Sequence, residues 1–69
     1  MENKAKAYIL AWRDAGETNE AETIWEGYNP KEARQRFNEA EFTDGIFFIE
    51  LWITNPDWDM DSRIDYKCI

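Results

Sequence analysis

The fold of this chain is decided by a short stretch near its middle, Asn29-Pro30-Lys31-Glu32. The side chain of Asn29 can accept hydrogen bonds from the first free backbone N–H groups of a helix. Pro30 suits the first helical position because an N–H there would have no partner, and Glu32 stands at the third position of a capping box. The stretch therefore predicts a helix that begins at this point.

Apolar residues continue at helical spacing after this start. Ala33, Phe37 and Ala40 form a narrow stripe on one side of the predicted helix, and the residues between them are mostly polar. The spacing predicts that the helix ends near Glu41 and that Phe42 folds back as an anchor. Such a helix has one apolar face to bury.

The residues before the helix alternate with the period of two that a strand requires. Lys4 to Arg13 and Glu20 to Tyr28 are the two predicted strands, and the polar segment 14–19 between them suits a hairpin loop. The expected faces of the first strand are Ala5, Ala7, Ile9 and Ala11 on one side, and Tyr8, Leu10 and Trp12 on the other. Those of the second strand are Ala21, Thr23 and Trp25 on one side, and Glu22, Ile24, Glu26 and Tyr28 on the other.

Two further strands are predicted after the helix. The segment 46–53 is rich in β-branched and aromatic residues, follows the turn signal Asp44-Gly45, and ends before Asn55-Pro56. Its expected faces are Phe47, Ile49, Leu51 and Ile53 toward the helix, and Ile46, Phe48, Glu50 and Trp52 away from it. Residues 63–69 are expected to return as a short fourth strand, with Ile64, Tyr66 and Cys68 on one face.

This order predicts an α+β fold, in which an antiparallel sheet of about four strands carries one helix on one face. The 69 residues form a single expected domain, 1–69, and a hydrophobic content of 43% is enough for the chain to fold. Cys68 is the only cysteine, so no intrachain disulfide can form, and histidine is absent. A core this small then depends on aromatic packing or on self-association.

The charge of the chain limits its partners. Eight basic and fifteen acidic residues give a net charge of −7, which repels a phosphate backbone and attracts a basic protein. We therefore expect no direct binding to nucleic acid. No apolar run is long enough for a signal peptide or a membrane span, so a cytoplasmic protein is expected.

The sequence offers little material for catalysis. It has no histidine, no glycine-rich phosphate loop and no paired cysteines, and it predicts neither an enzyme nor a cofactor. Glu20, Glu22 and Glu26 are expected on one side of the second strand, where carboxylates could act as acid and base. The alternative, a solvated strand face, needs no further assumption.

Asp57, Asp59 and Asp61 have the spacing that opens a calcium-binding loop. The rest of that motif is missing, because Ser62 stands where a glycine allows the turn and Cys68 stands where a glutamate closes the site. Ordinary loop acids explain the spacing equally well, since alternate residues of an extended segment face water. No metal site is predicted, although a weak cation site at this loop stays open.

Large side chains are expected on the sheet face opposite the helix. Alternation assigns eight residues to it: Tyr8, Leu10, Trp12, Ile24, Tyr28, Phe48, Trp52 and Tyr66. Exposed aromatic patches often mark interaction surfaces, and tryptophan and tyrosine are enriched among binding hot spots. The alternative is that the C-terminal segment and the acidic loop fold over this face as a lid.

In its length, its strand-strand-helix-strand order and its acidic strand and loop, the chain resembles the small acidic inhibitors that phages and mobile elements encode against bacterial defence systems, the anti-CRISPR and anti-restriction proteins. The resemblance is one of overall build and includes no motif. It implies a protein that presents carboxylates where its target expects the phosphates of DNA.

Two hypotheses of function follow from these features. In the first, the chain is an inhibitor that binds a basic, nucleic-acid-handling bacterial protein, with acids for attraction and aromatics as anchors. In the second, it is a structural or assembly protein that forms a homodimer through the aromatic face. The candidate partner-binding residues are Glu20, Glu22, Glu26, Tyr8, Trp12, Trp52, Asp57, Asp59 and Asp61.

Overall fold

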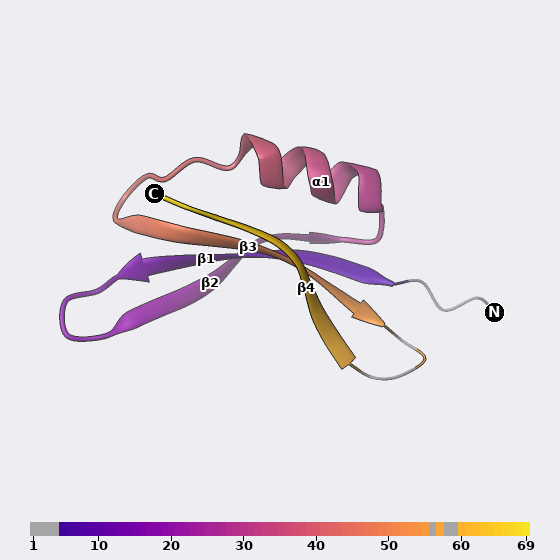
Figure 1. Ribbon diagram of the computed structural model, residues 1–69, viewed down its shortest axis with the longest axis horizontal. Helices are drawn as coiled ribbons and strands as arrows, with labels where there is room; N and C mark the ends of the chain where they lie inside the picture. Colours follow the sequence, from indigo (N-terminus) through magenta and orange to yellow (C-terminus); the bar gives the residue numbers. More distant parts are fainter. Residues whose placement is uncertain (1–4, 56, 58–59) are drawn as a thin grey trace.

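Four antiparallel strands and one helix follow one another along the chain in the predicted order (Figure 1). The computed structural model describes residues 5–55, 57 and 60–69. The elements are β1 (Lys6–Asp14), β2 (Asn19–Gly27), α1 (Pro30–Glu39), β3 (Ile46–Asn55) and β4 (Met60–Cys68). The α+β fold class is thereby confirmed, and α1 is neither long enough nor apolar enough to cross a membrane.

The strands lie in the order β2-β1-β3-β4, and every neighbouring pair is antiparallel. The two strands with apolar residues on both faces, β1 and β3, are therefore central, whereas the more polar β2 and β4 form the edges. This arrangement follows from burial, because a central strand has both faces and both backbone edges covered or paired.

The helix begins as its sequence predicts. The Asn29 side chain accepts hydrogen bonds from the backbone N–H groups of Lys31 and Glu32, and Pro30 occupies the first turn. The helix ends at Glu39, two residues earlier than expected. Phe42 then packs against the core, as the anchor prediction required.

The core lies between the helix and one face of the sheet. Its buried residues come from β1, α1 and β3: Ala7, Ile9, Ala11, Ala33, Phe37, Ile46, Ile49 and Leu51. Ala7 and Ala11 of β1 are small and allow α1 to approach closely, while β3 contributes three large aliphatic side chains. We call the face of the sheet that packs on this core the helix side.

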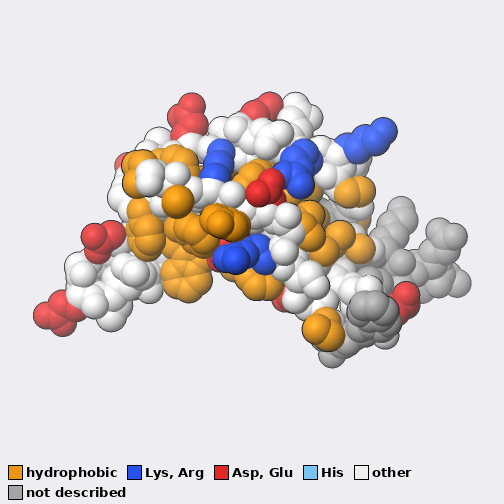
Figure 2. Space-filling view, viewed as in Figure 1, with side chains coloured by type: hydrophobic (Ala, Val, Ile, Leu, Met, Phe, Trp, Pro, Cys, Tyr) orange, Lys and Arg blue, Asp and Glu red, His pale blue; other side chains and the backbone are white. Residues whose placement is uncertain are grey.

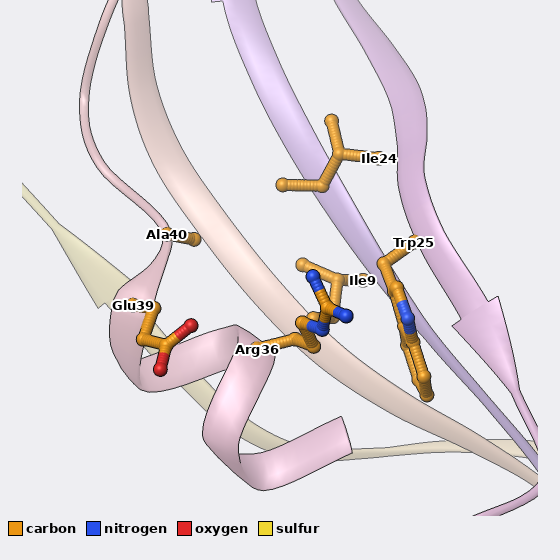
Figure 3. Close-up of a pocket in the computed structure, with 6 residues that line it drawn as sticks. All are labelled: Ile9, Ile24, Trp25, Arg36, Glu39 and Ala40. Carbon is orange, nitrogen blue, oxygen red and sulfur yellow. The ribbon is translucent and has the colours of Figure 1, made fainter. Parts of the chain in front are cut away.

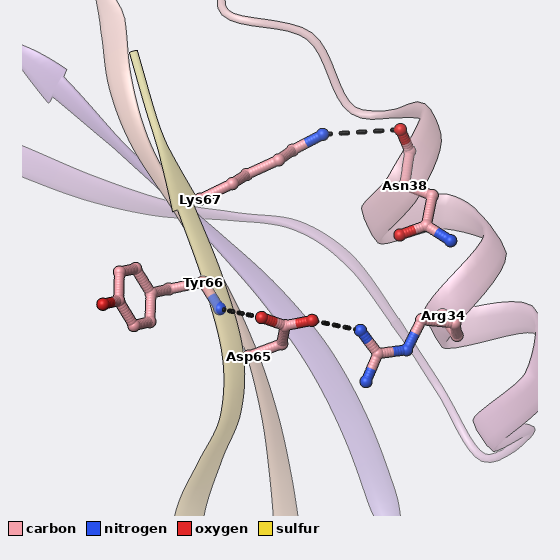
Figure 4. Close-up of polar contacts among 5 residues, drawn as sticks. All are labelled: Arg34, Asn38, Asp65, Tyr66 and Lys67. Atoms are coloured by element: carbon pink, nitrogen blue, oxygen red, sulfur yellow. Dashed lines mark hydrogen bonds and ion pairs between the residues drawn. The ribbon is translucent and has the colours of Figure 1, made fainter.

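Two polar contacts connect α1 to the edge strand β4 (Figure 4). Arg34 of the helix forms an ion pair with Asp65, which also accepts a hydrogen bond from the backbone N–H of Tyr66. Lys67 Nζ lies 3.4 Å from the carbonyl oxygen of Asn38 in α1 (Figure 4) and 2.5 Å from that of Ala40, just beyond the last turn. A cation at that position is favourable, because the last carbonyl groups of a helix carry partial negative charge.

Each edge strand contains a β-bulge at the same level of the sheet. Trp25 and Thr23 lie opposite the consecutive residues Ile9 and Leu10, so Ile24 is the extra residue of β2. In β4 the extra residue is Ile64. Bulges bend a strand and increase its twist. The first residues of β2 and of β4 both lie on the side of the sheet away from the helix (Figure 1), and the space-filling view shows a hollow between these two parts of the molecule (Figure 2).

The bulges also correct the expected assignment of faces. In β2, Trp25 lies opposite Ile9 on the helix side, but Thr23 and Ala21 lie opposite Leu10 and Trp12 on the other side, so the predicted alternation was wrong for this strand. A third irregularity lies between Trp12 and Arg13, which face Phe48 and Ile46, respectively. As a result Ile46, expected away from the helix, belongs to the core.

Candidate interaction face

The sheet face opposite the helix carries most of the large side chains that the sequence placed there. We call it the helix-free face and define it by eight residues of β1, β3 and β4: Tyr8, Leu10, Trp12, Phe48, Glu50, Trp52, Arg63 and Tyr66. The strand register brings them together, since Tyr8 lies opposite Trp52 and Trp12 lies opposite Phe48. Ile24, which was expected here, lies instead on the helix side.

Glu50 lies at the centre of this face and is 5% exposed, the one buried charged residue in the described part of the chain. Its Oε1 accepts a hydrogen bond from Trp12 Nε1 at 2.6 Å, and its Oε2 pairs with Arg63 Nη1 at 3.1 Å. A buried carboxylate needs such partners, because an unpaired buried charge is strongly destabilising. The two contacts also hold the Trp12 and Arg63 side chains in fixed positions.

Aromatic rings surround this carboxylate. The rings of Tyr8 and Trp52 are almost parallel, with centroids 6.3 Å apart, and those of Phe48 and Tyr66 lie 5.5 Å apart. The guanidinium of Arg63 stacks over the Tyr66 ring at 4.7 Å. Trp12, Phe48 and Trp52 are half-buried, whereas Tyr66 is 53% exposed. The face therefore combines fixed aromatic side chains with an accessible ring at its edge.

A second polar cluster lies at the end of β1 nearest the β3–β4 turn. Tyr8 donates a hydrogen bond to Asp61 Oδ2 at 2.6 Å, and Thr54 donates one to Asp61 Oδ1 at 2.8 Å. Burial, together with the hydrogen bond to Asp61, raises the pKa of Tyr8 to about 12. The same hydrogen bond, followed by that from Thr54, lowers the pKa of the Asp61 carboxyl below its usual value.

The C-terminal segment is not a lid over this face. Residues 60–68 form β4, which pairs with β3 along the edge of the sheet and contributes Arg63 and Tyr66 to the face itself. Within residues 5–55, 57 and 60–69, no second layer packs on the helix-free face. The acidic loop, the other part of the lid prediction, lies partly outside the described residues.

The three glutamates of β2 do not share a face, contrary to expectation. Glu22 lies opposite Ala11 and pairs with Arg13 on the helix side, with 3.0 Å between Oε1 and Nη2. Glu26 lies opposite Tyr8 and pairs with Lys6 at 3.0 Å. This ion pair raises the pKa of Lys6 above its usual value, mainly through the hydrogen bond with Glu26. The bulge lies between the two glutamates and changes the face of the strand.

Glu20 lies opposite Arg13 near the outer end of the β1–β2 hairpin, also on the Glu22 side of the bulge. No ion pair within 4.0 Å involves Glu20 in the described part of the chain. Figure 2 shows acidic side chains at this end of the molecule. The acids of β2 thus divide between two faces, so the three do not form one cluster on a single face of the sheet.

The acidic loop is only partly described. Asp57 is exposed in the β3–β4 turn, with its backbone N–H bonded to Asn55 Oδ1, and Asp61 lies in β4. Asp59 lies outside the described residues. Both Asp61 oxygens already accept hydrogen bonds. Among residues 5–55, 57 and 60–69, no group of three potential ligands is placed to hold a metal ion.

Sequence reasoning missed the role of Glu50 and Arg63. The signal for Glu50 was present, because a single acid interrupts the apolar run from Ile46 to Ile53 and a buried acid needs a partner. The signal for Arg63 was absent, since its position opposite Trp52 depends on the bulge at Ile64.

Comparisons of the chain with protein-family models, with curated proteins and with solved structures found no match. The function proposed below therefore depends on the chain's own residues.

Proposed function

We propose that this chain is a non-enzymatic, acidic protein-binding module, and that it docks a basic, nucleic-acid-handling protein on its helix-free face. The observation that carries the proposal is the set of aromatic side chains held around the buried Glu50, with no second layer over them in the described part of the chain. Rigid aromatic anchors of this kind supply most of the binding free energy in protein interfaces.

The charge of the molecule supports a basic partner. A net charge of −7 attracts a positively charged protein over long range and speeds its association. Acids lie at both ends of the sheet, with Glu17 and Glu20 near the β1–β2 turn and Asp57 at the β3–β4 turn. Proteins that handle nucleic acid carry basic surfaces. Together these features favour a partner from that class.

The more specific proposal is a phage-type inhibitor of a CRISPR or restriction component, acting in the host cytoplasm as a mimic of DNA charge. It is supported by the resemblance in build and by the net charge. The mimic cannot be a row of β2 glutamates, because Glu22 and Glu26 face opposite ways and are ion-paired. Acids at the hairpin ends are the better candidates for contacts that replace phosphates.

A homodimer through the helix-free face is the second candidate, favoured by the apolar character of the rings. The two candidates differ in salt dependence, because screening weakens attraction between charges and leaves apolar burial largely unaffected. A homodimer should persist in high salt, whereas a complex with a basic partner should form more slowly.

The test is affinity capture from a bacterial lysate with the immobilised chain, in parallel with Tyr66→Ala and Gln35→Ala variants. Tyr66 is an exposed ring of the helix-free face, and Gln35 is an exposed residue on the helix. We expect the parent and Gln35→Ala to retain a basic nucleic-acid-binding protein that Tyr66→Ala loses in a high-salt wash. Equal capture by all three would contradict docking on this face.

A further inference from the structure

The outer edge of β2 is available for pairing. Its one neighbour in the sheet is β1, and no other strand within the described residues lies along its outer side. The backbone N–H and C=O groups of an edge strand can pair with an additional strand from another chain. β2 has nine residues, which is long enough for such pairing.

A groove lies beside this edge, between β2 and the second half of α1 (Figure 3). It has a volume of about 270 Å³ and is lined by Ile9, Ile24, Trp25, Arg36, Glu39 and Ala40. Ile9 is fully buried at its base, and Ile24 is 42% exposed at its mouth. Four of the six lining residues are apolar, and Arg36 and Glu39 add one side chain of each charge.

The bulge of β2 shapes this groove. It places Ile24 and Trp25, consecutive residues, both on the helix side of the strand. The Trp25 ring extends along β2 over Gly27, where a Cβ atom would lie only 2.8 Å from it. Because the ring is directed toward the end of the strand, the space between Ile24 and the helix stays open (Figure 3).

The charge along the edge specifies the kind of partner. β2 carries Glu20, Glu22 and Glu26 and has no basic residue of its own. The side chains of Glu22 and Glu26 remain 52% and 59% exposed although each forms an ion pair with β1. Lysine or arginine in an added strand would complement these charges, whereas acidic residues would be repelled.

We propose that the β2 edge docks an extended basic segment of a partner protein, which adds to the sheet as a fifth strand and inserts one apolar side chain into the groove. Main-chain hydrogen bonds would then supply affinity, and the groove with the flanking glutamates would supply specificity. This proposal does not depend on the helix-free face, because the groove lies on the opposite side of the sheet.

A synthetic peptide of nine residues, the length of β2, provides the probe. It alternates lysine and valine and has a leucine at its centre, so that the leucine and the lysines face the same way. A control peptide replaces the leucine with aspartate. Calorimetry measures the dissociation constant, and hydrogen exchange identifies the protected amides. We expect binding of the leucine peptide, protection along β2, and affinity about tenfold weaker for the control.

Two matched variants identify the edge that binds. Ile24 and Ile64 are the extra residues of the two bulges, and they are 42% and 49% exposed. Ile24→Asp should weaken binding of the leucine peptide by at least about tenfold, whereas Ile64→Asp should leave it unchanged. Equal effects of the two variants, protection along β4, or no binding of the leucine peptide would each overturn the proposal.

If the leucine peptide does not bind, a variant with Glu20→Gln, Glu22→Gln and Glu26→Gln tests the opposite role of these acids. Self-association of this variant would show that the glutamates protect the β2 edge from pairing.

Discussion

Glu50 shows how one residue can organise a surface. Its two oxygens are bonded to Trp12 and Arg63, which come from the neighbouring strands on either side of β3. One carboxylate thereby connects three strands across the helix-free face. Glu50, the one acid within the apolar β3 sequence, is therefore needed to hold side chains of the helix-free face in position.

Replacing Glu50 with alanine should destabilise the protein by about 2 to 3 kcal/mol, because it leaves the Trp12 N–H unpaired and opens a small cavity. Urea unfolding followed by tryptophan fluorescence measures this loss. Glu26→Ala is the matched control, since it removes an exposed ion pair and should cost less than about 1 kcal/mol. Similar losses for the two variants would show that Glu50 is not a buried connection.

Tyr8 should make stability sensitive to alkali. With its pKa raised to about 12 in the folded protein, Tyr8 stays protonated there while the unfolded chain begins to ionise near pH 10. The stability that this shift contributes is fully present below pH 10 and is lost as the pH rises toward 12. Tyrosine absorbance during an alkaline titration follows the ionisation of Tyr8. Phe at position 8 should remove the late-ionising tyrosine, and a Tyr8→Phe trace identical to the parent would contradict the assignment.

At the scale of elements, the sequence predicted what depends on neighbouring residues along the chain. The cap at Asn29 and the period of two in β1 are local signals, and both predictions were correct. In β3 the predicted faces hold from Phe48 onward and are wrong at Ile46. The bulge at Ile24 could not be predicted, because it depends on how β2 aligns with Ile9 and Leu10 of β1. One extra residue reverses the direction of every side chain beyond it, which is why the β2 glutamates were assigned to one face.

The cap residue Asn29 and the buried Phe37 should contribute different amounts to the free energy of unfolding. Asn29→Ala removes the acceptor for two backbone N–H groups and should cost about 1 kcal/mol. Phe37→Ala empties a buried site and should cost about 3 kcal/mol or more, which is close to unfolding for a chain of this size. Urea melts compare the two. Variants that both match the parent would show that α1 does not pack as described.

The connection between α1 and β4 should contribute to stability in a pH-dependent way. Hydrogen bonds from Arg34 and from the Tyr66 backbone lower the pKa of Asp65 below its usual value of 3.8. A lowered pKa contributes stability that is present above pH 3.8 and is lost as the pH falls through the folded-state pKa. Asp65→Asn should therefore flatten acid unfolding monitored by circular dichroism. An acid limb as steep as that of the parent would exclude this contribution.

At the scale of the whole molecule, the two faces of the sheet have different roles. The helix side holds the core of aliphatic residues and Phe37, and the helix-free face holds aromatic rings around the buried carboxylate of Glu50. Each edge strand has a bulge in its middle, and the first residues of β2 and of β4 lie away from the helix (Figure 1). This shape and the net charge of −7 together favour a docking surface for a basic protein.

The most direct test measures association and dissociation rates of the captured partner by surface plasmon resonance, at low and high salt. Tyr66→Ala should raise the dissociation rate about tenfold or more with little change in association, as loss of an aromatic anchor does. Glu17→Lys with Glu20→Lys should slow association and reduce its salt dependence. Rates for Tyr66→Ala equal to those of the parent would contradict docking on the helix-free face.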